Sequence, residues 1–292
     1  MLAKLLRRLL ATQLLLGAVL GWFLGHQTAL GYWLIPLAAL LAPFAINLIL
    51  IVSYAVKSRT PGQSALWWRS VLGEYLACCR VYLLQQPWAN KPKLTMPPAG
   101  IHLKTPVVLV HGYLCNHKVW DRMAEQLRQA GHPVLAVDLE PLFTSIDRYA
   151  PIIEETASEL CRQTGVDQVA LVGHSMGGLA IRAWMRSCGT QRVARIVTLG
   201  TPHQGTRIDP HPKTPNGQQM FWHSDWLKAL ETSETPETRR LMHLALTPQD
   251  SIVYPQRAQL LEGAPVMIFE GLGHLELSQN RAVGDWVLSQ LR

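Results

Sequence analysis

Three residues in the second half of the chain have the types and the order that nucleophilic catalysis requires. The first, Ser175, lies in LVGHSMGGL between Gly173 and Gly177, in the pattern G-x-S-x-G. In this pattern a strand turns sharply into a helix, the serine occupies the strained corner, and glycine lets the neighbouring backbones approach closely. Because Gly and Ser are common, about one chain in ten of this length shows the pattern by chance, so the flanking sequence has to decide.

The sequence on both sides of Ser175 suits such an elbow. Residues 168–172, QVALV, are apolar and β-branched as in a buried strand, and residues 177–188, GGLAIRAWMRSC, predict a helix. The expected strand, turn and helix therefore lie in the order that the elbow around Ser175 requires. We expect the Ser175 hydroxyl to be held exposed over the end of a sheet.

A serine hydroxyl also needs a base, and the base needs a third group that holds its tautomer and orientation. On such a sheet the acid and then the histidine follow the serine, at the ends of later strands. Asp250 in LALTPQDSIVYP and His274 in FEGLGHLEL have this order, and each follows an apolar run. We predict Ser175 as the nucleophile, His274 as the base and Asp250 as the residue that orients it.

Other acids and histidines fit these roles less well. Glu270 and Glu276 remain alternatives to Asp250, although their closeness in sequence to His274 makes the reach awkward. The remaining candidates precede Ser175, lie in a long polar insertion or come before the acid loop: Asp138, His203, Asp209, His211, His223, Asp225, Glu234 and His243.

The reaction of a serine with an ester places negative charge on the carbonyl oxygen, which needs preorganised N–H donors. The backbone N–H of Met176, at the start of the elbow helix, is one predicted donor. The turn His111-Gly112-Tyr113 after an earlier strand supplies the other, from Tyr113, and Gly112 allows the close approach. The His111 side chain is expected to be a structural hydrogen-bonding group.

The elements that position these residues follow from the pattern after Thr105. Short apolar runs alternate with longer amphipathic ones, which predicts a parallel sheet with helices on both faces. The expected strands lie in PVVLVHGY, PVLAVDL, QVALVGHS, RIVTLGTP and APVMIFEGLGH, and the expected helices in HKVWDRMAEQLRQAG, YAPIIEETASELCRQTG, GGLAIRAWMRSC and SQNRAVGDWVLSQL. Residues 203–240 are polar and too long for an ordinary connection, which predicts a cap, with a short helix in MFWHSDWLKAL.

The N-terminal region has a different composition. The 48 residues from Leu9 to Val56 contain no Asp, Glu, Lys or Arg, whereas roughly 20 apolar residues suffice to cross a bilayer once. We predict a transmembrane hairpin of about Leu9 to Gly25 and about Leu30 to Val56. A cleaved signal peptide is the rival interpretation, but no small-residue cleavage site precedes a polar start.

The basic residues around this region predict its orientation. Lys4, Arg7 and Arg8 precede the first span and Lys57 and Arg59 follow the second, which places both ends, and the catalytic domain, on the cytoplasmic side of the inner membrane. Without these five residues the formal charge of +7 falls to +2. The remainder therefore lacks the basic footprint of a nucleic-acid-binding protein.

Between the anchor (residues 1–60) and the catalytic domain (residues 101–292) lies a connecting region, residues 61–100. In residues 64–84 an apolar stripe predicts an amphipathic helix, either in the lipid interface or packed on the globular domain. The stripe consists of Trp67, Val71, Tyr75, Cys78 and Tyr82. Residues 85–100, QQPWANKPKLTMPPAG, predict a proline-rich linker, and the five cysteines have spacings that favour reduced thiols over a metal site.

Five motifs, HGYLCN, GHSMGG, LGTPHQGT, DSIVYP and GLGHLEL, together resemble the α/β-hydrolase fold, and within it bacterial triacylglycerol lipases and esterases. The resemblance covers about residues 105–292. It implies hydrolysis of carboxylic esters through an acyl-enzyme and makes residues 203–240 a cap over an acyl pocket. The chain departs from secreted relatives, which have a cleavable signal and often a calcium site, and it has Met176 where lipases commonly have glutamine.

The expected function is therefore that of a membrane-anchored serine ester hydrolase acting on lipid-like acyl esters, with no cofactor, metal, nucleic acid or obligate protein partner. Two alternatives remain. One is an acyltransferase or thioesterase that uses the same triad, and the other is a non-catalytic membrane scaffold built on a hydrolase fold.

Overall fold

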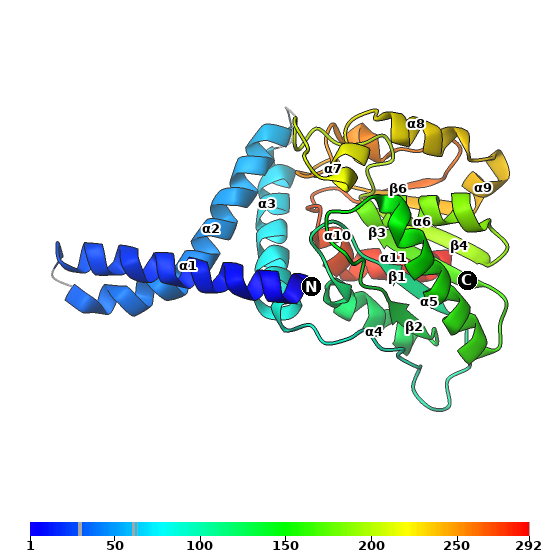
Figure 1. Cartoon of the computed structure of the whole chain (residues 1–292), viewed down its shortest axis with the longest axis horizontal. Helices are drawn as coiled ribbons and strands as arrows, with labels where there is room; N and C mark the ends of the chain where they lie inside the picture. The colour runs from blue at the N-terminus through cyan, green and yellow to red at the C-terminus, as the bar shows by residue number, and fades with distance from the viewer. Residues whose placement is uncertain (29–30, 60–61, 63, 292) are drawn as a thin grey trace.

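The computed structural model describes residues 1–28, 31–59, 62 and 64–291. It has two parts, a helical hairpin (Leu2–Ser58) and a globular domain whose first strand begins at Val107. Figure 1 shows the hairpin projecting to one side of the globular domain, with the helix α3 (Ser64–Cys78) between them.

The globular domain is built on one sheet of six parallel strands in the order β2-β1-β3-β4-β5-β6. The strands are β1 (Val107–Val110), β2 (Val134–Ala136), β3 (Val169–His174), β4 (Val193–Leu199), β5 (Met242–Leu246) and β6 (Val266–Ile268). The helices of its main body are α4 (Asp121–Gln129), α5 (Ala150–Thr164), α6 (Met176–Cys188), α10 (Glu276–Gln279) and α11 (Arg281–Gln290). The five expected strands and four expected helices are present, and the apolar run before Asp250 forms β5.

The strand register brings the polar loops to one edge of the sheet. Val110 at the end of β1 pairs with Gly173 near the end of β3, and His174 pairs with Leu199 at the end of β4. The ends of β5 and β6 are neighbours as well. Because all strands are parallel, the segments after these strands meet at the same edge.

Each face of the sheet has its own apolar core, since successive side chains of a strand point to opposite faces. Val108 and Val110 of β1 belong to a cluster with buried residues of α5 and α6. Val107 and Leu109 belong to a second cluster with residues of α3, α4 and α11. The second cluster also includes Ile51 from the hairpin, so the hairpin contributes to the core of the globular domain.

The hairpin consists of α1 (Leu2–Gly25), a 3₁₀ turn (Gly31–Trp33) and α2 (Leu34–Ser58). By length and composition α1 and the segment Gly31–Ser58 are long and apolar enough to cross a membrane. Their outward surfaces carry large exposed apolar side chains. The second turn of α1 contacts the region that connects the hairpin to the globular domain, through the hydrogen bond from Arg7 Nη1 to the Pro87 carbonyl at 2.7 Å.

The two hairpin helices pack through glycines spaced four residues apart in α1. A Cβ at Gly17 would lie 2.8 Å from the Ala39 Cα, and a Cβ at Gly21 would lie 2.7 Å from the Ile35 Cα. Larger side chains would therefore push the backbones apart. Close contact through small residues is typical of helix pairs in membranes, where apolar side chains gain nothing by turning inward.

The helix α3 packs on the globular domain, which is one of the two environments that its sequence left open. The buried side chains Trp67, Val71 and Cys78 join the core on that face of the sheet. A second apolar stripe on α3 is exposed instead and consists of Trp68, Leu72 and Leu76. The segment after α3 is also held in place, because Thr95 pairs with Val134 at the edge of the sheet.

Between β4 and β5 the chain forms the cap segment, residues 203–240, with three short helices, α7 (Pro215–Gln219), α8 (Asp225–Thr232) and α9 (Pro236–Arg240). The helix expected in MFWHSDWLKAL begins later than its apolar residues predict. His223 has a φ of 53°, which a right-handed helix cannot include. Ser224 then caps α8 by accepting a hydrogen bond from the Leu227 N–H.

A buried ion pair fixes the end of the cap segment to α6. The Arg182 Nη2 lies 3.0 Å from a carboxylate oxygen of Glu234, and both side chains are almost fully buried. Arg239 of α9 contacts the same carboxylate. The cap segment is therefore held at its C-terminal end by charges that have no access to water.

Candidate active site

The serine of the elbow occupies a strained corner. Ser175 lies between β3 and α6 with φ 54° and ψ −127°, a backbone conformation that residues other than glycine rarely adopt. Its N–H donates to the Leu199 carbonyl at 2.9 Å, which ties the corner to β4. A Cβ at Gly173 would lie 2.7 Å from the Gly178 nitrogen, so the turn has space only for glycine there.

The acid and the histidine proposed from the sequence are in direct contact. The distance between Asp250 Oδ2 and His274 Nδ1 is 2.7 Å, and both side chains are buried. The other carboxylate oxygen, Oδ1, accepts hydrogen bonds from the N–H groups of Ile252 and Val253 at 2.8 Å each. These bonds keep the Asp250 carboxylate in one orientation towards the imidazole.

The environment of His274 favours its protonated form. Burial lowers the pKa of His274, but the Asp250 carboxylate and its hydrogen bond, with a contribution from Glu74, raise the pKa above its ordinary value. An imidazole with this environment can accept a proton and hold it as a buried imidazolium. The ring nitrogen Nε2 is left free of Asp250, which occupies Nδ1.

Two further residues hold the loop of His274, and neither is predicted from the sequence. His174 Nε2 donates to the His274 carbonyl at 3.0 Å. Burial lowers the pKa of His174 to about 3, so this ring stays neutral. Its position directly before Ser175 was visible in the sequence, but nothing there indicated which residue it would contact.

The second of these residues is Glu74 on α3. Its carboxylate accepts hydrogen bonds from the Leu275 N–H at 2.8 Å and from the Glu276 N–H at 3.1 Å. The side chain is buried, and burial raises the pKa of Glu74 to about 7. No sequence signal singled it out, because it lies 201 residues from Leu275.

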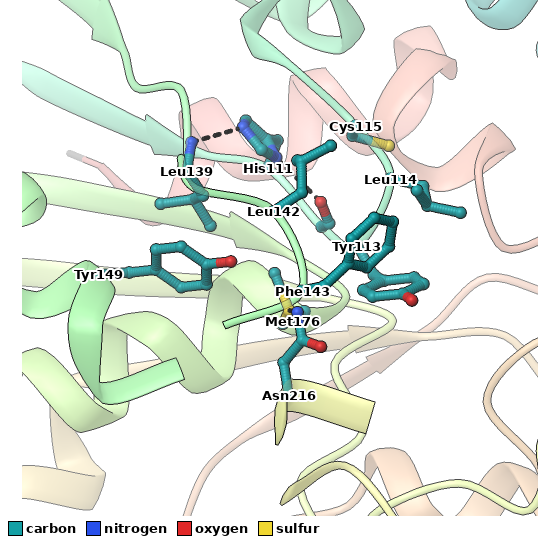
Figure 2. Close-up of a pocket in the computed structure, with 11 residues that line it drawn as sticks. His111, Tyr113, Leu114, Cys115, Leu139, Leu142, Phe143, Tyr149, Met176 and Asn216 are labelled. Atoms are coloured by element: carbon teal, nitrogen blue, oxygen red, sulfur yellow. Dashed lines mark hydrogen bonds between the residues drawn. The ribbon is translucent and has the colours of Figure 1, made fainter. Parts of the chain in front are cut away.

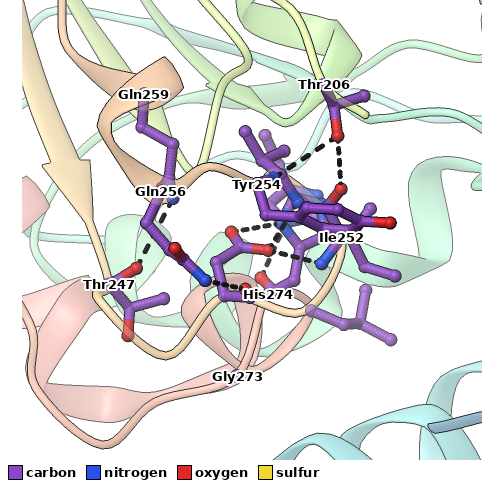
Figure 3. A network of polar contacts seen from close by, with 12 residues as sticks. Thr206, Thr247, Ile252, Tyr254, Gln256, Gln259, Gly273 and His274 are labelled. Atoms are coloured by element: carbon purple, nitrogen blue, oxygen red, sulfur yellow. Dashed lines mark hydrogen bonds and ion pairs between the residues drawn. The ribbon is translucent and has the colours of Figure 1, made fainter. Parts of the chain in front are cut away.

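A network of polar contacts ties the acid loop to the cap segment and to the hairpin. Figure 3 shows the part of this network around Thr206, Ile252 and Gln256. Thr206 of the cap segment donates to the Ile252 carbonyl at 2.6 Å. The Gln256 side-chain amide donates to the Asp250 carbonyl at 2.9 Å and to the Ser58 carbonyl, at the end of α2, at 3.0 Å. The loop that carries Asp250 is thus held by the cap segment and, through Gln256, by the end of α2.

The predicted oxyanion turn lies directly beside the serine. A Cβ at Gly112 would lie 2.8 Å from the Ser175 Cβ, so only glycine fits there. Met176 is the first residue of α6, at the positive end of the helix dipole. Gly177 lies under the same turn, since a Cβ there would lie 2.7 Å from the His111 carbonyl oxygen.

Figure 2 shows the surroundings of this turn, where Tyr113, Phe143, Met176 and Asn216 line a small pocket. His111 has the structural role that its sequence position suggested. Its Nε2 accepts a hydrogen bond from the Leu139 N–H at 3.0 Å, and its Nδ1 lies 2.9 Å from the Gly112 carbonyl oxygen. Burial lowers the pKa of His111, so the ring is neutral and fixes the turn through both nitrogens.

Ser175 and His274 open on one cavity of about 650 Å³. This volume lies within the range of about 300–1,000 Å³ of small-molecule sites. Its walls come from five segments: Gly112, Tyr113 and Leu114 of the oxyanion turn; Thr206, Ile208 and Met220 of the cap segment; Ile252 and Val253 of the acid loop; Leu50, Ile51, Tyr54 and Lys57 of α2; and Glu74, Cys78 and Tyr82 of α3 and the residues that follow it.

The rival candidates have other surroundings. Asp138 is hydrogen-bonded to His117 at 3.0 Å, and His203 contacts Thr198 and Arg182. Glu276 accepts from the Gly273 N–H at 3.0 Å, whereas the hydrogen bond to the His274 ring comes from Asp250. Among the described residues no group of three or more His, Cys, Asp and Glu side chains could hold a metal ion, and the five cysteines are free thiols.

The chain resembles known hydrolases in sequence. The family described as alpha/beta hydrolase fold matches residues 105–230. A triacylglycerol lipase of Burkholderia plantarii is 32% identical over 143 residues, which are 43% of this chain and 39% of the lipase. Methylesterase 3 of Arabidopsis thaliana is 32% identical over 142 residues, 46% of this chain and 53% of that enzyme. The chain thus spans about a third to a half of the curated relatives it matches.

Solved structures show the same fold. The mature lipase BlEst2 of Bacillus licheniformis superimposes with a TM-score of 0.61 and 18% identity, over 70% of this chain and 99% of that one. Lipase B of Aspergillus fumigatus gives a TM-score of 0.56 and 15% identity, over 68% of this chain and 55% of that one. The globular domain has the α/β-hydrolase fold. In sequence and in fold the globular domain is similar to lipases and esterases of this kind.

Proposed function

We propose that the protein is a membrane-anchored serine ester hydrolase that cleaves lipid-like acyl esters through an acyl-enzyme. The observation that supports this most strongly is the buried Asp250–His274 pair at 2.7 Å, which opens on the same cavity as a strained Ser175. A structural histidine does not need a carboxylate held by two backbone N–H groups. That arrangement suits a base whose tautomer must be fixed.

In the first half-reaction the Ser175 oxygen attacks the ester carbonyl carbon while His274 Nε2 takes the serine proton. The carbonyl oxygen gains negative charge, and the N–H groups of Tyr113 and Met176 donate to it. The tetrahedral intermediate then collapses as the ester C–O bond breaks, and the alcohol leaves with the proton from His274. The acyl group stays on Ser175.

In the second half-reaction water replaces the alcohol. His274 takes a proton from the water molecule as its oxygen attacks the acyl carbon, and the same two N–H groups stabilise the oxyanion. Collapse releases the carboxylic acid and returns the proton to Ser175. The buried Asp250 carboxylate stabilises the imidazolium in both steps, which agrees with the raised pKa of His274.

The membrane part of the proposal is supported by the hairpin. Its two helices are apolar, expose large apolar side chains and pack through glycines. Basic residues at both ends of the hairpin and none in its connecting turn favour a cytoplasmic globular domain. A reporter fused to the C-terminus tests this, because cytoplasmic reporter activity is expected and periplasmic activity would contradict it.

Labelling with a fluorophosphonate probe tests the catalytic part. We expect the detergent-purified protein to be labelled and the variant Ser175→Ala to lose the label. Ser187→Ala, on the same helix but at its far end, is the matched control and should keep it. If the folded protein takes no label, or if Ser175→Ala is labelled like the wild type, Ser175 is not an activated nucleophile.

A further inference from the structure

The membrane hairpin of this protein also forms part of its substrate site. We infer that α2 is a wall of the catalytic cavity and that the substrate is a zwitterionic glycerophospholipid taken directly from the bilayer. Its phosphate would contact Lys57 and its ammonium group Asp209. This inference rests on the proposed ester hydrolase and adds the substrate class and its route of entry.

The position of α2 is the first observation. Leu50, Ile51, Tyr54 and Lys57 line the cavity that Ser175 and His274 also line. Leu50 is about half exposed, with a relative accessibility of 49%, whereas Ile51 is buried at 7%. One face of α2 therefore reaches from the outer surface of the hairpin into the catalytic cavity.

The contacts of α2 with the globular domain show that this wall is built into the fold. The Trp67 indole N–H donates to the Ala55 carbonyl at 3.2 Å in a buried position, and Gln256 donates to the Ser58 carbonyl at 3.0 Å. Gln256 also holds the Asp250 carbonyl. A single side chain, that of Gln256, therefore links the end of α2 to Asp250 in the acid loop.

The surfaces next to this wall suit lipid. The exposed neighbours Leu48 and Ile49 on α2 are apolar. The second, exposed stripe of α3, described above, adds Trp68, Leu72 and Leu76. Tyr54 and Lys57 lie in the last two turns of α2, and Tyr and Lys are residue types that concentrate where a membrane helix meets the head groups.

Apart from Glu74 and His274, which belong to the candidate catalytic machinery, two charged side chains line the cavity and would select the head group. Lys57 is the single Lys or Arg side chain that lines the cavity in the described part of the chain, and there its ammonium has no carboxylate within ion-pair distance. Asp209, exposed on the cap segment, lines the same cavity. A cation from α2 and an anion from the cap segment complement a phosphate and an ammonium group on one molecule.

The covalent step remains that of the proposed function. Ser175 attacks one acyl ester of the phospholipid, the lysophospholipid leaves as the alcohol, and water then releases the fatty acid. The acyl chain occupies the apolar part of the cavity, between Ile51, Ile208 and Met220. The head group stays at the end of α2, so the lipid does not need to leave the bilayer completely.

The full chain in vesicles of ether-linked phosphatidylcholine, which has no ester bond to cleave, provides the test. Ester-linked phosphatidylethanolamine, phosphatidylglycerol and diacylglycerol are added as guests, and mass spectrometry counts the fatty acid and lysolipid from each. We expect the fastest cleavage for phosphatidylethanolamine. Equal cleavage of the three guests, or preference for diacylglycerol, would overturn the inference.

Variants test each element. Lys57→Gln should lower the ratio of phosphatidylethanolamine to diacylglycerol cleavage about fivefold, the effect of about one favourable charge near a head group. Asp209→Asn should lower the ratio of phosphatidylethanolamine to phosphatidylglycerol cleavage. Leu50→Trp should fill the α2 side of the cavity and lower the ratio of lipid to soluble p-nitrophenyl butyrate cleavage about tenfold.

The matched control is Ile49→Trp, which makes the same change one residue away and outside the cavity lining. If Leu50→Trp and Ile49→Trp have the same ratio, α2 is not a wall of the substrate site. The soluble ester separates the two proposals. Cleavage of p-nitrophenyl butyrate without cleavage of lipid defeats this inference alone, and loss of both, together with loss of labelling, defeats the proposed function.

A second observation, independent of the cavity, concerns Glu74. We propose that Glu74 is a positioning residue for the His274 base. It accepts hydrogen bonds from the two residues that follow His274, at 2.8 Å and 3.1 Å, while Asp250 holds the imidazole itself. A Cβ at Gly273 would lie 2.6 Å from the Glu74 Cβ, so the loop passes directly over this side chain.

Several titratable groups surround Glu74. His274 and Asp250 face it from the catalytic loops, Glu276 donates its backbone N–H to it, and Cys78, Tyr82 and Cys115 lie on its other sides. Burial raises the pKa of both thiols and of Tyr82, so these three groups stay neutral. Burial also raises the pKa of Glu276, whose carboxylate accepts from the Gly273 N–H. Glu74 and His274 act directly on each other's charge.

The variant Glu74→Gln tests this role through the pH profile. An ionised Glu74 raises the pKa of His274, and the enzyme needs a neutral His274, so activity is lost as the pH falls through that pKa. Glu74→Gln should move the acid limb of kcat/KM for p-nitrophenyl butyrate to lower pH and lower kcat about tenfold. KM should change less than kcat.

Rates are expressed per active site, titrated with the fluorophosphonate probe, so that a loss of folded protein does not imitate a loss of rate. Glu276→Gln is the matched control, because Glu276 accepts from Gly273 and does not touch His274. Its acid limb should stay in place. An unchanged acid limb in Glu74→Gln, or an equal shift in both variants, would show that Glu74 only supports the fold.

Discussion

The helical hairpin and the globular domain of this chain place their apolar side chains in opposite ways. In the globular domain most large apolar side chains are inside, and the buried polar groups of the site are held by hydrogen bonds. In the hairpin the large apolar side chains point outward and the contacts between helices are made by glycines. Burial positions the candidate catalytic groups in the globular domain, and close backbone contact positions the two helices in the hairpin.

The two parts meet at the catalytic cavity. The helix α2 lines it, and α3 brings Glu74 to the loop of His274. Because the site depends on both parts, substitutions in the globular domain and substitutions in the hairpin can both impair it. The three predictions that follow separate the effects that belong to the globular domain from those that belong to the hairpin.

The largest effect is expected inside the site. Asp250→Asn keeps the shape of the side chain but removes its charge and favours the wrong tautomer of His274, so kcat should fall by about three to four orders of magnitude. The thermal stability of the hairpin should not change. Steady-state kinetics with a soluble ester measure the effect, and a loss below tenfold would show that His274 does not depend on Asp250.

The next effect concerns the buried ion pair of the cap segment. Glu234→Gln leaves Arg182 charged and without its full partner, at a cost of about 3–5 kcal/mol of unfolding free energy. Chemical denaturation of the detergent-solubilised protein measures it. Glu237→Gln removes an exposed pair with Arg240 on the same segment and should cost little; equal losses would mean that the buried pair carries no special weight.

The smallest effect is expected in the hairpin. Gly21→Leu forces α1 away from α2 and should lower the free energy of unfolding by about 1–3 kcal/mol, the usual cost of overpacking. Unfolding by SDS in mixed micelles, followed by circular dichroism, measures it. Val19→Leu on the exposed side of α1 is the control. If both variants behave alike, the glycine contacts do not hold the hairpin together.

Local patterns allowed much of the fold to be predicted. The strand–turn–helix around Ser175 was read from its apolar run and its glycines, and the structure has β3, the elbow and α6 there. The start of the α8 helix was placed too early, because a positive φ at His223 depends on how the cap segment folds back and has no strong signal in its residue types.

The triad candidates illustrate a different limit. Asp250 and His274 could be chosen from their order and from the apolar runs before them, because parallel strands bring their ends to one edge. The roles of Glu74 and His174 could not be predicted, since residue types and local spacing do not indicate which distant residue a buried polar side chain contacts. Their contacts join residues 201 and 100 positions apart.

The sequence by itself determined the uncharged hairpin, the parallel sheet, the elbow and the order of the candidate nucleophile, acid and base, since each follows from residue types and their order along the chain. Only the tertiary structure decided that α2 lines the catalytic cavity, that Gln256 joins the acid loop to the end of α2, and that Glu74 holds the His274 loop. The physical reason is that these contacts join segments far apart in the chain, and they form only when both apolar cores bring those segments together.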